Sequence, residues 1–109
     1  MYKHDACISE EVREFLNVSK TFSEDTFVRM ADIQSELGEL SKEILKATRY
    51  GKTETPTRHE SIEDEYGDLL FSVLALGVEL KADPEYCLRK SIEKYNKRLE
   101  RTGQIGSGV

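Results

Sequence analysis

An eight-residue phrase occurs twice in this 109-residue chain, 29 positions apart. Residues 33–40 read Ile-Gln-Ser-Glu-Leu-Gly-Glu-Leu, and residues 62–69 read Ile-Glu-Asp-Glu-Tyr-Gly-Asp-Leu. Both copies have isoleucine at the first place, glutamate at the fourth, glycine at the sixth and leucine at the eighth, and both have an acid at the seventh. The repeat therefore predicts two equivalent segments that present the same acidic pair.

Apolar side chains recur three and four residues apart through both segments, which is the spacing of an amphipathic helix. They are Met30, Ile33, Leu37, Leu40 and Ile44 in the first segment and Ile62, Tyr66, Leu69, Val73, Leu76 and Leu80 in the second. At ~100° per residue, each acidic pair lies at the same offset from its apolar face. If the two helices pack antiparallel, the carboxylates of Glu36, Glu39, Glu65 and Asp68 converge on one cleft.

Four carboxylates beside an apolar face repel one another unless a cation neutralises them. Ligands that are all oxygen favour a hard ion, Mg²⁺ or Mn²⁺, over zinc or copper. The alternative is a solvated charged face, which is common for a single Glu-x-x-Glu on a helix. Because the pair recurs in register, we favour a metal site. Gly38 and Gly67 interrupt the same helices, either for close approach of a ligand or backbone or for tight helix packing.

Four helices account for nearly the whole chain, and no stretch shows sustained strand alternation. We expect an all-α fold in which residues 1–109 form one domain, a four-helix bundle completed by oligomerisation. The expected helices cover residues 9–19, 25–49, 57–81 and 84–103, and the glycine-rich tail from about residue 103 is expected to be flexible. Their expected end signals are Gly51 and Gly103 as C-terminal caps, a Thr57-x-x-Glu60 capping box, and Asp83-Pro84 at the start of the last helix.

The composition narrows the classes of partner. A formal charge of −5 and a pI near 5.1 argue against a protein that coats nucleic acid. The chain has no apolar run long enough for a membrane span, and its polar start does not resemble a signal peptide, so we expect a cytoplasmic protein. Cys7 and Cys87 stand far apart without zinc-ligand spacing, which argues against a disulfide framework or a zinc site.

The last expected helix is basic along one flank. Its basic residues are Lys90, Lys94, Lys97, Arg98 and Arg101. Cations near a helix C-terminus complement the helix dipole, and this explanation stays open. The other explanation is phosphate binding, since a hard metal and a basic helix together can neutralise the oxygens of a polyphosphate.

These residues resemble the MazG-like, all-α nucleoside triphosphate pyrophosphohydrolases. The family motif is Glu-x-x-Glu on one helix and Glu-x-x-Asp on the next, found here as Glu36 with Glu39 and Glu65 with Asp68. The resemblance spans about residues 33–98, and its basic segment at residues 94–98 is similar to the Lys and Arg positions that follow the second motif in the family.

The resemblance implies Mg²⁺-dependent hydrolysis of a nucleoside triphosphate to the monophosphate and pyrophosphate, with Mn²⁺ as a substitute ion. It implies Glu36, Glu39, Glu65 and Asp68 as the catalytic metal ligands, Lys94 and Arg98 as substrate-binding residues, and a homodimer or homotetramer with no nucleic-acid or membrane partner. Phosphoribosyl-ATP pyrophosphohydrolase activity and a non-enzymatic helical interaction module with an acidic face remain alternatives. A di-iron bundle is disfavoured, because neither His4 nor His59 stands three residues after a motif acid.

Overall fold

The computed structural model describes residues 7–19 and 25–104, and within these ranges the chain is helical with no strand. The helices are α1 (Ile8–Ser19), α2 (Thr26–Ala47), α3 (Glu60–Leu80) and α4 (Pro84–Thr102). The expected all-α class is confirmed. None of the described helices is long and apolar enough to cross a membrane.

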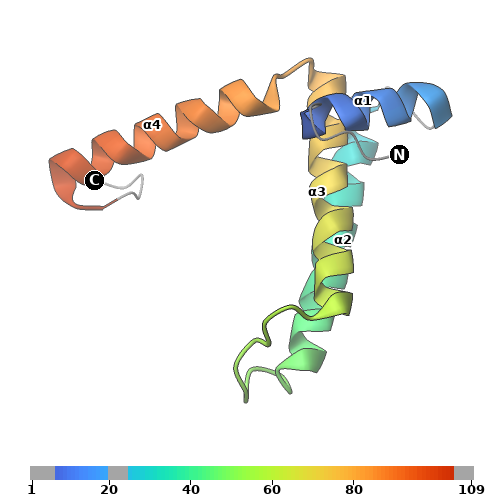
Figure 1. Cartoon of the computed structure of the whole chain (residues 1–109), viewed down its shortest axis with the longest axis vertical. Coiled ribbons are helices and arrows are strands. Elements are labelled where there is room, and N and C mark those ends of the chain that lie inside the picture. The colour runs from blue at the N-terminus through green and yellow to red at the C-terminus, as the bar shows by residue number, and fades with distance from the viewer. Residues whose placement is uncertain (1–6, 20–24, 105–109) are drawn as a thin grey trace.

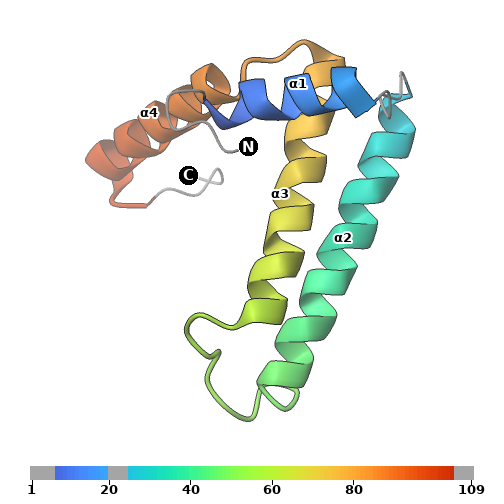
Figure 2. The same cartoon turned by 45° about the vertical axis from the view of Figure 1, so that its right-hand side comes forward.

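Helices α2 and α3 form an antiparallel hairpin, and α1 lies across the end of it that holds the α3 C-terminus (Figure 2). The buried core is small and sits where α1 meets α3. It consists of Val12, Leu16 and Ala75, with Phe71, Leu74 and Val78 packed against it. The rings of Phe15 and Phe71 meet edge to face, with their centroids 5.7 Å apart. Apolar contact between α1 and α3 therefore closes this end of the hairpin.

A buried ion pair ties α2 to α3 at the same end. The Arg29 Nε donates to Glu79 Oε2 at 3.0 Å, and the two side chains are only 9% and 2% exposed. Removing one partner would leave the other charge buried, so this pair is costly to break. It lies far along the hairpin from the acidic repeats and has a structural role.

The expected ends of α2 and α3 at the connecting loop are wrong. Helix α2 ends at Ala47 rather than near Gly51, because Arg49 and Tyr50 adopt left-handed φ values of 52° and 61°. The Thr48 hydroxyl steadies this turn, donating to the Ile44 carbonyl at 2.7 Å and accepting the Gly51 N–H at 3.0 Å. Helix α3 begins at Glu60, with His59 as the preceding residue, and no Thr57 capping box forms. Arg58 adopts a left-handed conformation (φ 58°), which turns the chain between Thr57 and the helix.

Helix α4 begins and ends as expected. The Asp83 carboxylate accepts the N–H groups of Glu85 and Tyr86, Pro84 occupies the first turn, and Gly103 closes the helix in the left-handed conformation. None of its residues is buried, and it extends away from the hairpin (Figure 1). The expected flexible tail lies outside the described residues from residue 105 onward. Within one chain the bundle is therefore open.

Leu16 is the most completely buried large side chain, at 1% exposure. We predict that Leu16→Ala lowers the free energy of unfolding by about 2–4 kcal/mol, because the substitution leaves a cavity between α1 and α3. Urea titration followed by circular dichroism measures this change at fixed protein concentration. Val18→Ala, at a side chain that is 83% exposed, is the control and should change little. Equal effects of the two substitutions would contradict the assignment of the core.

Candidate metal centre

Three acids from the two repeats come together in the hairpin. Glu36 projects from α2, and Glu65 and Asp68 project from α3, where their spacing of three residues places them on one face. One carboxylate oxygen of each lies within 4.8 Å of the others. The antiparallel packing of α2 against α3 thus brings Glu36 close to Glu65, which lies 29 positions later in the sequence, and to Asp68.

The fourth acid of the two motifs, Glu39, lies beside this cluster rather than in it. Its side chain is 52% exposed, and its Oε2 is 3.9 Å from the Lys42 Nζ. The distance is long for an ion pair of such exposed groups, so the contact adds little stability. Glu39 is near enough for its charge to act on Glu65, and it remains available to a ligand that approaches from solvent.

The electrostatics of the cluster act most strongly on Glu65. Partial loss of hydration, followed by repulsion from Asp68 and then from Glu36, Glu39 and Glu43, raises the pKa of the Glu65 carboxyl above its usual value. Asp68 and these three glutamates are all acids, and together they oppose the ionisation of Glu65. A positive charge placed among them would relieve this repulsion.

Glu43 also belongs to this acidic surface, although it lies outside the two repeats. It follows Glu36 by seven residues, which puts it two turns further along the same face of α2. Its Oε2 accepts from the Lys46 Nζ at 3.1 Å, yet its charge still contributes to the raised pKa of Glu65. The seven-residue spacing was the available signal. Asp32, the other outer acid on α2, is exposed.

The donor set of the cluster fits a hard divalent cation. Glu36, Glu65 and Asp68 offer only carboxylate oxygens, one from each within 4.8 Å of the others. Opposite ligands of one Mg²⁺ ion span ~4.2 Å, so a small side-chain shift lets one ion contact all three. No His or Cys belongs to the group, which disfavours zinc and copper. Glu36 and Glu65 are half-buried and Asp68 is exposed, so the site is open to solvent on one side.

Two glycines leave space next to these acids. Gly38 and Gly67 stand between the acids of each motif, and a Cβ built on either would have no atom within 4 Å to meet. Tight packing of α2 against α3 therefore does not require glycine at these positions within one chain. Both explanations offered above therefore require a second molecule, because either a ligand or a closely packed helix of another chain would have to fill this space.

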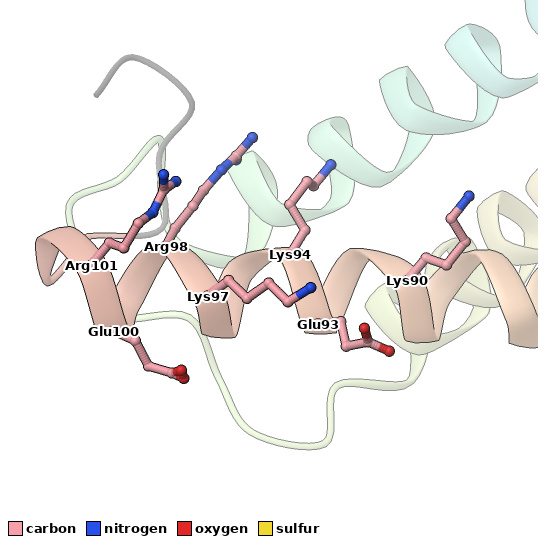
Figure 3. Close-up of a pocket in the computed structure, with 7 residues that line it drawn as sticks. All are labelled: Lys90, Glu93, Lys94, Lys97, Arg98, Glu100 and Arg101. Atoms are coloured by element: carbon pink, nitrogen blue, oxygen red, sulfur yellow. The ribbon is translucent and has the colours of Figure 1, made fainter.

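The basic residues of α4 form a second charged surface, here called the basic stripe. Figure 3 shows Lys90, Lys94, Arg98 and Arg101 projecting to the same side of the helix. The ammonium of Lys94 and the guanidinium of Arg98 lie 5.4 Å and 5.9 Å from the centre of the Tyr95 ring. A surface hollow of about 720 Å³ runs along these residues, and its lining also includes Lys97, Glu93 and Glu100.

The acidic cluster and the basic stripe do not meet within one chain. The cluster lies on the α2–α3 hairpin, whereas α4 departs from the C-terminal end of α3 and extends away from it (Figures 1 and 2). The structure thus brings Glu36, Glu65 and Asp68 together, with Glu39 beside them, and keeps Lys94 and Arg98 on a separate element.

Similarity to a known protein covers part of this chain. A stretch of 44 residues is 41% identical to the nucleoside triphosphate pyrophosphohydrolase/pyrophosphatase MazG of Thermotoga maritima. The stretch covers 40% of this chain and 17% of that protein. No family model matches the chain, and no solved structure matches it significantly. The chain is therefore similar to a MazG protein over a limited segment.

The repulsion at Glu65 gives a testable pH dependence. Because its pKa is raised in the folded chain, metal-free protein loses stability as pH rises through the ordinary value of 4.5 toward the raised pKa, and stays less stable above it. We predict that Glu65→Gln raises Tm at pH 7 in EDTA by a few degrees, and that this gain disappears below pH 4. Thermal unfolding followed by circular dichroism measures both. Asp64→Asn, at the neighbouring exposed acid, is the control, and an equal gain there would refute the assignment.

Proposed function

We propose that this chain is a Mg²⁺-dependent nucleoside triphosphate pyrophosphohydrolase, which releases a nucleoside monophosphate and pyrophosphate. The observation that carries the proposal is the convergence of Glu36, Glu65 and Asp68, from two copies of one motif, within 4.8 Å. The partial similarity to a protein named as a nucleoside triphosphate pyrophosphohydrolase supports the same reaction class. Mn²⁺ is expected to substitute for Mg²⁺, because it accepts the same oxygen ligands.

In this proposal the acids hold the ion and handle the proton. Glu36, Glu65 and Asp68 are the metal ligands, and Glu39 completes the set from the solvent side, directly or through water. The bound ion would supply Lewis-acid polarisation of the phosphate oxygens and a lowered pKa for the attacking water. A carboxylate oxygen that is not engaged by the metal accepts the proton of that water. The acids thereby serve as both catalytic residues and metal ligands.

Lys94 and Arg98 are the proposed substrate-binding residues. They stand one turn apart and project to the same side of α4, so both can contact one triphosphate (Figure 3). The guanidinium of Arg98 can bind two phosphate oxygens at once, whereas the Lys94 ammonium acts as a compact charge. Both would stabilise the negative charge of the departing pyrophosphate.

The proposal requires a second copy of the chain, since one chain keeps the two charged surfaces apart. Helix α4 has an exposed apolar face, where the exposed fraction runs from 40% at Tyr95 to 61% at Leu88. The hairpin also exposes apolar side chains, among them Leu37, Tyr66 and Val73. Packing these faces together in a homodimer or homotetramer removes both from water.

Charge favours the same assembly. Helix α4 carries six basic and three acidic residues, a net charge of +3, whereas α3 carries six acidic and no basic residues. Attraction between α4 of one copy and the hairpin of another therefore guides the pairing. The basic stripe lies on a different side of α4 from Leu88, Ile92 and Leu99, so it is not covered by this packing. In the proposed assembly it stays open beside the interface, where Lys94 and Arg98 at its edge can face the acidic cluster of another copy.

The function is tested by incubating the pure protein with a panel of ribo- and deoxyribonucleoside triphosphates, and with phosphoribosyl-ATP, in the presence of Mg²⁺. We predict that Glu36→Gln and Asp68→Asn each lower kcat/KM on the order of a hundredfold or more, because each removes a metal ligand. Separation of pyrophosphate from orthophosphate identifies the bond cleaved. Asp32→Asn, on the exposed face of α2, is the control and should retain activity. Absence of Mg²⁺-dependent pyrophosphate release from every substrate would refute the proposal.

The assembly is tested separately by light scattering coupled to size-exclusion chromatography. We predict that the double substitution Leu88→Gln/Ile92→Gln shifts the protein toward the monomer, because it makes the apolar face of α4 polar. Glu93→Gln/Glu100→Gln changes two residues on another side of the same helix and serves as the control. A wild-type protein that is monomeric at high concentration would contradict the proposed assembly.

A further inference from the structure

The first turns of α1 and α4 meet at one contact, here called the Ser9–Glu85 joint. The Ser9 hydroxyl, on a side chain only 5% exposed, donates to the Glu85 carboxylate, with Oγ 2.9 Å from Oε1 and 3.1 Å from Oε2. The Cys7 Sγ lies 3.2 Å from the same Oγ. A hydrogen bond to a charged group that is shielded from water is stronger than an exposed one.

Glu85 stands where two helices begin. It belongs to the first turn of α4, and its carboxylate accepts the hydroxyl of Ser9 in the first turn of α1. The hollow around the joint, about 350 Å³, is lined by basic and acidic residues, Arg13 and Lys81 together with Glu10 and Asp83. The Ser9 hydrogen bond is therefore the contact that ties the start of α4 to the start of α1.

The backbone that links α3 to α4 is short. It consists of Lys81, Ala82 and Asp83, between the last residue of α3 and the first of α4. Lys81 is left-handed, the Ala82 N–H donates to the Gly77 carbonyl at 3.0 Å, and Asp83 caps α4. These bonds fix each side of the link to its own helix. The angle between α3 and α4 then depends on few backbone torsions and on the Ser9–Glu85 contact, which ties α4 to α1, the helix that packs on α3.

A small change of that angle moves the basic stripe by a large distance. Arg98 follows Pro84 by 14 residues, so it lies ~21 Å along α4 from the link at 1.5 Å per residue, and a rotation of ~10° displaces it by ~4 Å. This displacement exceeds the length of a hydrogen bond. Within one chain no residue of α4 is buried, so little packing along its length resists the rotation, and a partner that covers its apolar face would meet α4 in the direction that the joint sets.

We infer that Ser9 and Glu85 are positioning residues, whose contact sets the direction of α4 and thereby the place at which the basic stripe presents Lys94 and Arg98. Both residues of the joint belong to the same chain, so the joint directs α4 whether the basic stripe meets the acidic cluster of its own chain or that of another copy. Neither residue contacts the reacting atoms. The structural part of this inference stands on the contact itself, and only its consequence for turnover rests on the proposed function.

The direction of α4 can be measured directly. Spin labels are attached through a ketone-bearing unnatural amino acid at the exposed positions of Lys42 on α2 and Glu100 on α4, which leaves Cys7 and Cys87 in place. Labelled chains are diluted with excess unlabelled chains, so that pulsed electron paramagnetic resonance reports distances within one chain. We predict that Ser9→Ala and Glu85→Ala shift or broaden the wild-type distance distribution. Ser91→Ala, the matched control on α4, should not.

Glu85→Gln refines this test, because its amide oxygen can still accept the Ser9 hydroxyl without the negative charge. Its distance distribution should be closer to that of the wild type than the Glu85→Ala distribution is. Helix content by circular dichroism verifies that every variant is folded. Distributions of Ser9→Ala and Glu85→Ala that superimpose on the wild type would overturn the inference.

Kinetics supply the second readout. Ser9→Ala should raise KM for the triphosphate about tenfold, since misplaced cations bind phosphate less well, while Mg²⁺ affinity measured by calorimetry stays unchanged. An unchanged KM in an active enzyme would overturn the positioning role. If the wild type hydrolyses no nucleotide, the proposed function fails, and the distance measurement still decides whether the joint directs α4.

Discussion

Packing of α2 against α3 is the interaction on which the rest of the structure depends. It places Glu36 of α2 against Glu65 and Asp68 of α3, although these carboxylates repel one another and Glu36 would move away from the other two if the helices separated. The stabilisation is distributed along two helices of 22 and 21 residues and is reinforced by the Arg29–Glu79 pair, whereas the repulsion is confined to one place. Packing along the two helices therefore outweighs the repulsion among these carboxylates and keeps their negative charge in one place, where a cation could bind.

How far this arrangement could be predicted depends on the physical origin of each part. The helices and the meeting of the acids follow from spacing, because residues three and four apart share a face whatever surrounds them. The position of Glu39 does not follow, since a small rotation of α2 about its axis decides whether Glu36, Glu39 or both point inward. Spacing also identifies Asp83, Pro84 and Gly103 as ends of α4, because local backbone chemistry alone determines them.

Other features depend on contacts that a pattern does not encode. The left-handed backbone at Arg49 and Tyr50 ends α2 before Gly51, and the left-handed Arg58 delays the start of α3 past Thr57. An amphipathic pattern predicts that α4 has an apolar face, yet it does not say what covers that face. The contact of Ser9 with Glu85 joins residues 76 positions apart and carries no periodic signal. Local chemistry is thus readable from the sequence, and the direction of whole elements is not.

The open space at Gly38 and Gly67 has a consequence for the stability of the hairpin. Glycine inside a helix costs up to ~1 kcal/mol relative to alanine, and neither position has a neighbour that a methyl group would disturb. A methyl group at either position would therefore raise helix propensity without a clash inside one chain. Alanine at these two places should make an isolated chain more stable, and it would cost something only where a second molecule occupies the space beside the acids.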